Sequence, residues 1–296
     1  MYWINTIIQG ALVGGLYALF ATGLSLMFGV MRIINLAHGD FIVLSAYLAI
    51  VVMDVVGVNP LWALAIVAPL MFVVGYVLQR GLLNFTLGGD ILRPLLVTFG
   101  LSVIIQNVLL ELFSADSRRL QLPWLEMTSV RIGDQLAIGL MPATVFVVAV
   151  VVISVIELLL YRTELGRAFR ATSDDTDTAR LYGVNNRNVY ALATAIALAV
   201  VSIAGVLFGI RTIFDPTIGP ARLLYAFEVV IIGGLGSLWG TLAGGVILGV
   251  AQAMGAAFDP SWDTLAGHVV FLIVLLFRPR GLIPKTFDLL IPFLIT

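Results

Sequence analysis

Long apolar segments are the feature that most restricts the fold of this 296-residue chain. Predominantly apolar runs fall near residues 5–30, 35–57, 60–80, 92–113, 137–160, 189–212, 223–235, 237–257 and 263–277. Most of them reach the roughly 20 residues that a helix needs to cross a bilayer. Hydrocarbon offers no hydrogen-bond partner to the backbone, so such runs form helices. We therefore predict an all-α polytopic membrane protein with about eight transmembrane helices.

Two apolar runs need separate treatment. The run 223–235 is too short to cross alone, and only Gly236 separates it from the run 237–257. We predict a broken or re-entrant pair of segments here. No Lys or Arg precedes the first run, which begins at Ile4, so we expect it to persist as a helix rather than be cleaved as a signal peptide.

The composition supports this class and excludes some sites. Hydrophobic residues make up 60% of the chain, and its mean hydropathy is +1.08. Because cysteine is absent, disulfides and thiolate metal sites are excluded. The net charge of −1 gives no sign of a nucleic-acid partner, and we expect none. With no repeat or low-complexity linker, we predict one membrane domain over residues 1–296.

The basic residues predict the orientation in the membrane. If the loop 161–187 is cytoplasmic, that side holds Arg32, Arg80, Arg93, Arg162, Arg167, Arg170, Arg180, Arg187, Arg278, Arg280 and Lys285. The other side then holds Arg118, Arg119, Arg131, Arg211 and Arg222. Cytoplasmic loops are enriched in basic residues. We therefore expect the amino terminus outside and the carboxyl terminus in the cytoplasm.

Charge is concentrated in the loop 161–187, above all in the stretch ELGRAFRATSDDTDTARLYGV. Ser173 as a cap, acidic residues in the next turn, Arg180 near the end and Gly183 as a stop predict a short helix from Asp174 to Tyr182. Such a helix is too short to be stable alone. It could lie on lipid headgroups or dock on a cytosolic protein. Its acidic residues and small apolar face favour docking.

The chain lacks the means to hydrolyse ATP itself. It contains no Gly-Lys dipeptide, and its one lysine is Lys285, whereas a phosphate-binding loop needs glycine amides and a lysine. A partner protein or an ion gradient must supply the energy for transport. A gradient-driven carrier or channel, which acts without ATPase subunits, is therefore the alternative to a transporter powered by a partner ATPase. An intramembrane enzyme is disfavoured because no HExxH motif, Ser/His pair or paired carboxylates stand out. The two histidines also predict no metal site.

Glu228 is the most informative acidic residue at membrane depth. A charged carboxylate there costs at least a few kcal/mol, so it needs a partner or a water-filled path. Arg211, Arg222 and His268 are all possible partners. Glu228 could act as a gate or contact a substrate ammonium group, but we favour a structural ion pair. Gly233, Gly234 and Gly236 follow it, and such breaks can free backbone groups to line a cavity.

Three further patterns suggest functions. The sequence RIINLAHGD places Asn35, His38 and Asp40 at the start of a span, where they could shape the inner gate.

Glycines spaced by four, at Gly10 and Gly14 and again from Gly236 to Gly244, favour close helix packing. In the predicted outer loop, charged residues suit a soluble receptor, although a plain solvated loop explains them equally well; they are Asp116, Arg118, Arg119, Glu126, Arg131 and Asp134.

The quoted loop resembles the cytoplasmic coupling loop of ABC-transporter permeases of the LivH-type, branched-chain amino-acid family. The resemblance extends to GLSLMFGVMRIINLAHGDFIVLSAYLA, VVIIGGLGSLWGTLAGGVILG and RPRGLIPK, in the family's order. It implies that the loop sits on an ATP-hydrolysing subunit. The coupling residues carried over on this basis are Glu164, Gly166, Arg167, Ala168, Ala179 and Gly183. The charge pattern of the predicted helix adds Asp174, Asp175 and Arg180. Asp174 and Asp175 stand where a fuller loop often has Glu or Gln.

The resemblance also implies partners and a location. The chain would pair with a LivM-type permease and two ATP-binding subunits of the LivG/LivF type, which hold ATP and Mg²⁺. It would bind no cofactor itself. A periplasmic or tethered binding protein would deliver leucine, isoleucine, valine or a related solute. The location implied is the cytoplasmic membrane of a bacterium or archaeon.

Overall fold

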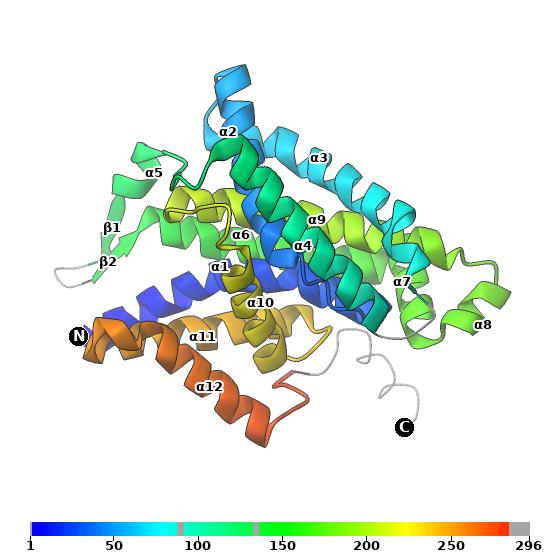
Figure 1. Cartoon of the computed structure of the whole chain (residues 1–296). Coiled ribbons are helices and arrows are strands. Elements are labelled where there is room, and N and C mark those ends of the chain that lie inside the picture. The colour runs from blue at the N-terminus through cyan, green and yellow to red at the C-terminus, as the bar shows by residue number, and fades with distance from the viewer. Residues whose placement is uncertain (1, 88–91, 133–135, 284–296) are drawn as a thin grey trace.

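The computed structural model has the predicted helical architecture (Figure 1). It describes residues 2–87, 92–132 and 136–283. Within these ranges, eight helical segments are long and apolar enough to cross a membrane. They are α1 (Tyr2–Met31), α2 (His38–Val56), α3 (Pro60–Gly81) with the 3₁₀ turn η1 (Leu83–Phe85), α4 (Leu92–Phe113), α6 (Leu140–Arg162), α9 (Asn186–Arg211), α11 (Leu238–Phe258), and η2 (Pro260–Trp262) with α12 (Asp263–Phe277). The prediction of about eight spans is therefore confirmed.

The eight segments are not equally buried. In α1 and α9, 72% and 78% of the most apolar stretch is buried inside the chain, whereas in the α12 segment only 6% is. A helix that is apolar on all sides is expected either in a protein core or against lipid. We conclude that α1 and α9 form the core and that α12 lies at the periphery with apolar side chains facing outward.

Small residues bring α1 and α11 into backbone contact. The two helices run antiparallel, with Gly10 next to Gly249 and Gly14 next to Gly245. A Cβ atom added at Gly14 would lie 2.6 Å from the Cα atom of Val246, closer than any side chain tolerates. This agrees with the packing role predicted for the spaced glycines, because dispersion between close backbones drives helix association in lipid.

Helix α10 (Gly219–Gly233) is the predicted short segment. It has 15 residues, is not one of the eight candidate spans, and runs across the direction of α1 and α11 in Figure 1. Gly234 and Gly236, with φ angles of 114° and 81°, turn the chain into α11. The segment that follows α12 packs on the end of α10, since the Leu282 amide donates to the Ile232 carbonyl at 3.0 Å. The sequence pattern did not indicate that contact.

The connection between α4 and α6 contains structure that was not predicted. After the short helix α5 (Pro123–Met127), strands β1 (Ser129–Ile132) and β2 (Leu136–Gly139) pair antiparallel, with Ser129 opposite Gly139. The apolar run expected from residue 137 therefore starts as a strand, and α6 begins at Leu140. A four-residue strand before an apolar helix is masked by the hydropathy of the helix itself.

Candidate functional site

Two helices, rather than one, occupy the charged loop after α6. The predicted helix from Asp174 with a Ser173 cap was wrong: α7 (Glu164–Asp174) runs through Ser173, and α8 (Thr176–Leu181) follows it. The Ser173 hydroxyl donates to the Gly29 carbonyl at 2.6 Å instead of capping a helix. Asp175 caps α8, accepting from the amides of Asp177 and Thr178 at 3.0 and 3.1 Å.

The hydrogen bonds to Asp175 keep this cap charged. The Thr178 hydroxyl donates to the carboxylate at 2.6 Å and, with the backbone amides, lowers the pKa of Asp175 below its ordinary value. A lowered carboxyl pKa means that the cap is intact above the ordinary pKa and is lost only as the pH falls through the lowered one. The break between α7 and α8 is therefore stable across the physiological range.

Helix α7 is anchored to the helical core, whereas the end of α8 is exposed. Phe169 is fully buried against residues of α1, α6 and α9, and Gly166 packs on the Leu160 carbonyl with no room for a side chain. At the end of α8, Leu181 and Tyr182 are 87% and 85% exposed. Gly183, with a φ of 85°, turns the chain back so that the Val184 amide donates to the Ala179 carbonyl at 3.1 Å.

The structure brings the predicted coupling residues together on this loop, and their coupling role stays a prediction. Glu164 and Arg167 form an exposed ion pair, one turn apart, at the start of α7. Asp174 ends α7, and Arg180 lies in the last turn of α8. An exposed pair such as this contributes about 1 kcal/mol or less to stability, so its charges are available to a partner.

The predicted gate residues at the start of α2 are buried together. The His38 Nε2 atom lies 2.7 Å from the Phe20 carbonyl, and the Gln106 amide donates to Asp40 at 2.9 Å. Asn35 accepts from the Ala37 amide at 3.0 Å. The cluster joins α1, α2 and α4, but none of its three predicted residues lines the cavity described below. Its role in a gate stays a prediction.

Glu228 has one of its proposed partners. Its carboxylate pairs with Nδ1 of His268, which links α10 to α12. The Glu228 side chain is 1% exposed and that of His268 is 33% exposed. Neither Arg211 nor Arg222 takes this place, although both were considered. The arrangement supports the structural interpretation of Glu228, because a buried carboxylate needs such a partner.

The glycines after Glu228 are packed closely. Gly233 lies against Gly240, and Gly234 lies against the Ile283 carbonyl, so neither position has room for a side chain. Gly236 supplies the second turn with a positive φ. These glycines form the turn from α10 to α11. None of the three lines the cavity described below, and their contact with the translocation path stays a prediction.

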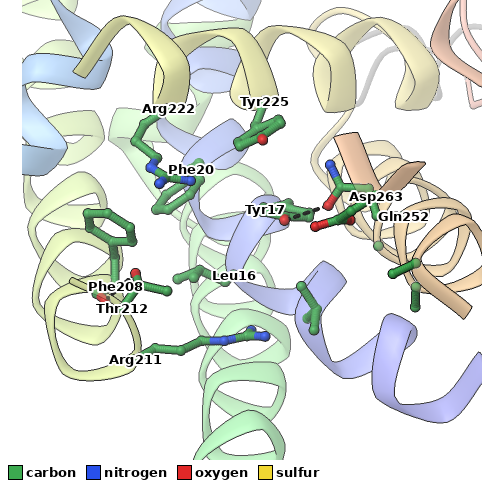
Figure 2. A pocket seen from close by; sticks show the side chains of 14 residues that line it. Leu16, Tyr17, Phe20, Phe208, Arg211, Thr212, Arg222, Tyr225, Gln252 and Asp263 are labelled. Atoms are coloured by element: carbon green, nitrogen blue, oxygen red, sulfur yellow. Dashed lines mark hydrogen bonds between the residues drawn. The ribbon is translucent and has the colours of Figure 1, made fainter. Parts of the chain in front are cut away.

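A cavity of about 440 Å³ with both charged and apolar walls lies near the end of α9, whereas α7 packs near its start; Figure 2 shows the side chains that line the cavity. It is bounded by the middle of α1, the last turn of α9, the start of α10, the last turns of α11 and the start of α12. The residues that line it are Val13, Leu16, Tyr17, Phe20, Phe208, Arg211, Thr212, Arg222, Tyr225, Gly249, Gln252, Ala253, Ala256 and Asp263. Its volume is within the range of small-molecule sites.

One hydrogen bond and two cation–π contacts organise the cavity wall. The Tyr17 hydroxyl donates to Gln252 at 2.6 Å, joining α1 to α11. The Arg222 guanidinium lies 4.7 Å from the centre of the Phe208 ring and 5.6 Å from that of Tyr225. The sequence analysis placed these two arginines on the outer side and considered them as partners for Glu228, but it did not predict that they share a cavity. The available signal was the presence of guanidinium groups next to apolar spans, where they are costly.

A family model described as "Branched-chain amino acid transport system / permease component" matches residues 6–278. The chain belongs to this family. The permease is 32% identical over 298 residues to the high-affinity branched-chain amino acid transport system permease protein BraD of Pseudomonas aeruginosa, covering 96% of both chains. It is 27% identical over 299 residues to LivH of Escherichia coli, again over 96% of each.

A further relative, matched over a smaller share of its length, comes from the same class of transport system. LivM of Escherichia coli, also named a high-affinity branched-chain amino acid transport system permease protein, is 27% identical to the permease over 300 residues. The match covers 92% of this chain and 68% of LivM. The resemblance found in the motifs is thereby confirmed over nearly the full length, and the protein is a multi-pass permease component.

Proposed function

We propose that the permease imports branched-chain amino acids, or a related small polar solute, across the cytoplasmic membrane of a bacterium or archaeon. In this proposal residues 1–296 are one membrane domain that pairs with a LivM-type permease. Two ATP-binding subunits of the LivG/LivF type hold ATP and Mg²⁺ and supply the energy. A periplasmic or tethered binding protein delivers the cargo and much of the selectivity.

The observation that carries the proposal is the α7–α8 pair. Because Phe169 is buried against α1, α6 and α9, a displacement of α7 must be accommodated by these helices. Leu181 and Tyr182 on α8 offer an exposed apolar tip to a soluble subunit. We accordingly place α7 and α8 in the cytoplasm, with the amino terminus outside and the carboxyl terminus inside, as the basic residues indicate. Eight spans alone would leave both termini on one side, so in this proposal α10 and the residues flanking it carry the chain across once more, which agrees with the contact between the end of α10 and the residues after α12.

Uptake of radiolabelled L-leucine into proteoliposomes tests this function. We expect uptake only when the permease, its second permease, the ATP-binding subunits, the binding protein and ATP are all present. Uptake by the chain alone, driven by a proton or sodium gradient, would instead support the gradient-driven carrier. The absence of branched-chain amino acid uptake by the complete assembly would overturn the proposed cargo.

The turn after α8 supplies a test of coupling. Gly183 has a φ of 85° and open space around it, so Gly183→Val strains the backbone without a steric clash. We expect the subunit to insert normally but to bind the ATP-binding subunits about tenfold more weakly, as measured by quantitative co-purification. Asp175→Lys, which removes the α8 cap, should act in the same direction.

Gly57 offers a matched control for that test. It also has a positive φ, 74°, and open space, but it ends α2 rather than α8. Gly57→Val introduces similar strain, so we expect it to leave binding of the ATP-binding subunits unchanged. Equal binding by wild type, Gly183→Val and Asp175→Lys would remove α8 from the proposed contact.

The outer loop supplies a test of receptor docking. Arg119 pairs with Glu126 and donates to the Ile210 carbonyl at 3.1 Å, so it holds the loop in place. Arg118 is exposed, and its backbone pairs with Phe214. Because charges at an interface rim steer association, Arg118→Glu should raise the binding-protein concentration for half-maximal transport roughly threefold or more.

Arg93 is the control for Arg118, since it is an exposed arginine at the other end of α4. Arg93→Glu should leave the binding-protein titration unchanged. If Arg118→Glu also leaves it unchanged, the loop is a solvated connection rather than a receptor contact. The predicted contributions of Arg131 and Asp134 cannot be placed in this contact, because the Arg131 side chain and Asp134 lie outside the described structure.

A further inference from the structure

The cavity at the outer end has a positively charged side, with no ion-paired carboxylate among the described residues. Arg211 and Arg222 come from the end of α9 and the start of α10 and lie on the same side of the pocket in Figure 2. Neither forms an ion pair with a described residue, and the Arg211 Nη1 and Arg222 Nε atoms are buried without a hydrogen-bond partner there. Buried guanidinium donors left in this state are costly, so a ligand anion would satisfy them.

The opposite side of the cavity carries a carboxylate. Asp263 at the start of α12 lies in Figure 2 beside Tyr17 and Gln252, which bond to each other at 2.6 Å. Asp263 has no ion-pair partner among the described residues. The cavity is therefore bipolar, with donors for an anion on one side and an acceptor for a cation on the other.

Apolar side chains line the cavity beside these charged groups. In Figure 2 Phe20 lies beside Arg222, Leu16 lies between Arg222 and Arg211, and Tyr17 lies between the arginine side and Asp263. Val13, Ala253 and Ala256 complete the apolar lining. A simple inorganic anion would leave both the Asp263 carboxylate and this apolar surface without a complement. A small molecule with a carboxylate, an ammonium group and an aliphatic side chain complements all three parts.

We propose that this cavity is a binding site for a free aliphatic α-amino acid, with its carboxylate against Arg211 and Arg222 and its ammonium group toward Asp263. The proposal rests on the proposed function and adds a substrate contact within the permease, at the end where the binding protein would release its cargo. Arginine suits the carboxylate because its planar donors match two carboxylate oxygens.

A cysteine reporter tests the site without relying on transport. The natural chain has no cysteine, and among the described residues the Thr212 hydroxyl bonds to the Phe208 carbonyl of the preceding helical turn, at 3.1 Å. We would label the introduced cysteine of Thr212→Cys in the assembled complex with a water-soluble methanethiosulfonate, with and without L-leucine, in nucleotide-free and ATP-bound states. Labelling should slow at millimolar L-leucine in at least one state.

The control reporter is Thr6→Cys. Thr6 makes the same kind of bond, to the Tyr2 carbonyl at 3.1 Å, but does not line the cavity. Its labelling should not respond to leucine. In the Thr212→Cys background, Arg222→Gln and Asp263→Asn should each raise the leucine concentration for half-protection by about 10- to 100-fold, as expected for a lost charged hydrogen bond. Asp54→Asn, at an exposed aspartate outside the cavity, should not.

Two analogues separate the proposed ligand from a simpler one. Leucinamide lacks the carboxylate and 4-methylpentanoate lacks the ammonium group, so both should protect far less than L-leucine. Equal protection by 4-methylpentanoate would overturn the proposal in favour of a plain anion site. If Thr212→Cys is labelled at the same rate with and without each aliphatic amino acid, in a complex that imports leucine, the binding site is overturned while the proposed function stands. If leucine slows labelling in a complex that imports no branched-chain amino acid, the binding site stands and the proposed cargo is overturned.

Discussion

Replacing Gly14 with leucine should remove most of the folded permease. The neighbours of Gly14 on α11 are backbone atoms of Gly245 and Val246, which cannot move aside by changing a rotamer. Overpacking a well-packed core costs typically 1–3 kcal/mol, and we expect about 3 kcal/mol here because the contact is with backbone. The measurements are the yield of monodisperse protein in detergent and its melting temperature, both of which should fall.

Gly100 supplies the control for this substitution. It lies within α4, and a Cβ atom added there meets nothing within 4 Å. Gly100→Leu makes the same change of residue in a helix without the clash, so its effect should stay within about 0.5 kcal/mol. If Gly14→Leu has the same melting temperature as wild type, the close approach of α1 and α11 does not hold the fold together.

The spans of the permease were predictable because each depends mainly on its own residues. Bilayer thickness fixes how many apolar residues a helix needs, and the spacing of Gly10 and Gly14 marks one face of α1. The short segment before Gly234 was predictable for the same reason, since its length alone excludes a full crossing. These properties can be counted along the chain without knowing what lies beside it.

The break between α7 and α8 depended on a distant residue. Ser173 and Asp175 are both good cap residues, and local sequence cannot choose between them. The choice follows from the Gly29 carbonyl at the end of α1, which takes the Ser173 hydroxyl and leaves Asp175 to cap the second helix. The same limit applies to the contact between Leu282 and Ile232, which joins residues fifty positions apart.

The cavity was missed for a related reason. Its polar residues come from five helices, and none is unusual by its local sequence. Only the fold shows that Arg211 and Arg222 share a pocket with Asp263 while Glu228 is occupied by His268. A search that treats each charged residue near an apolar span as needing a partner would have found the unsatisfied arginines, but it could not have placed them together.

Removing the partner of Glu228 should be more damaging than neutralising Glu228 itself. In His268→Leu, a carboxylate that is 1% exposed loses the ring nitrogen that binds it. Removing one member of a buried pair costs about 3–5 kcal/mol, and we expect a loss near 3 kcal/mol because His268 is partly exposed. Glu228→Gln keeps a hydrogen bond to His268 without the charge, so the assembled complex should form but transport less per ATP hydrolysed.

A double-mutant cycle distinguishes the pair from its surroundings. Glu228→Leu combined with His268→Leu removes both polar groups, and it should be closer to wild type in melting temperature than His268→Leu alone. Glu157→Gln is the control, because Glu157 also accepts from a ring nitrogen, that of Trp239, but near the protein surface. Its effect should be small. If His268→Leu melts like wild type and Glu228→Gln transports normally, then the contact between α10 and α12 needs neither the charge nor the hydrogen bond, and packing alone holds the two helices together.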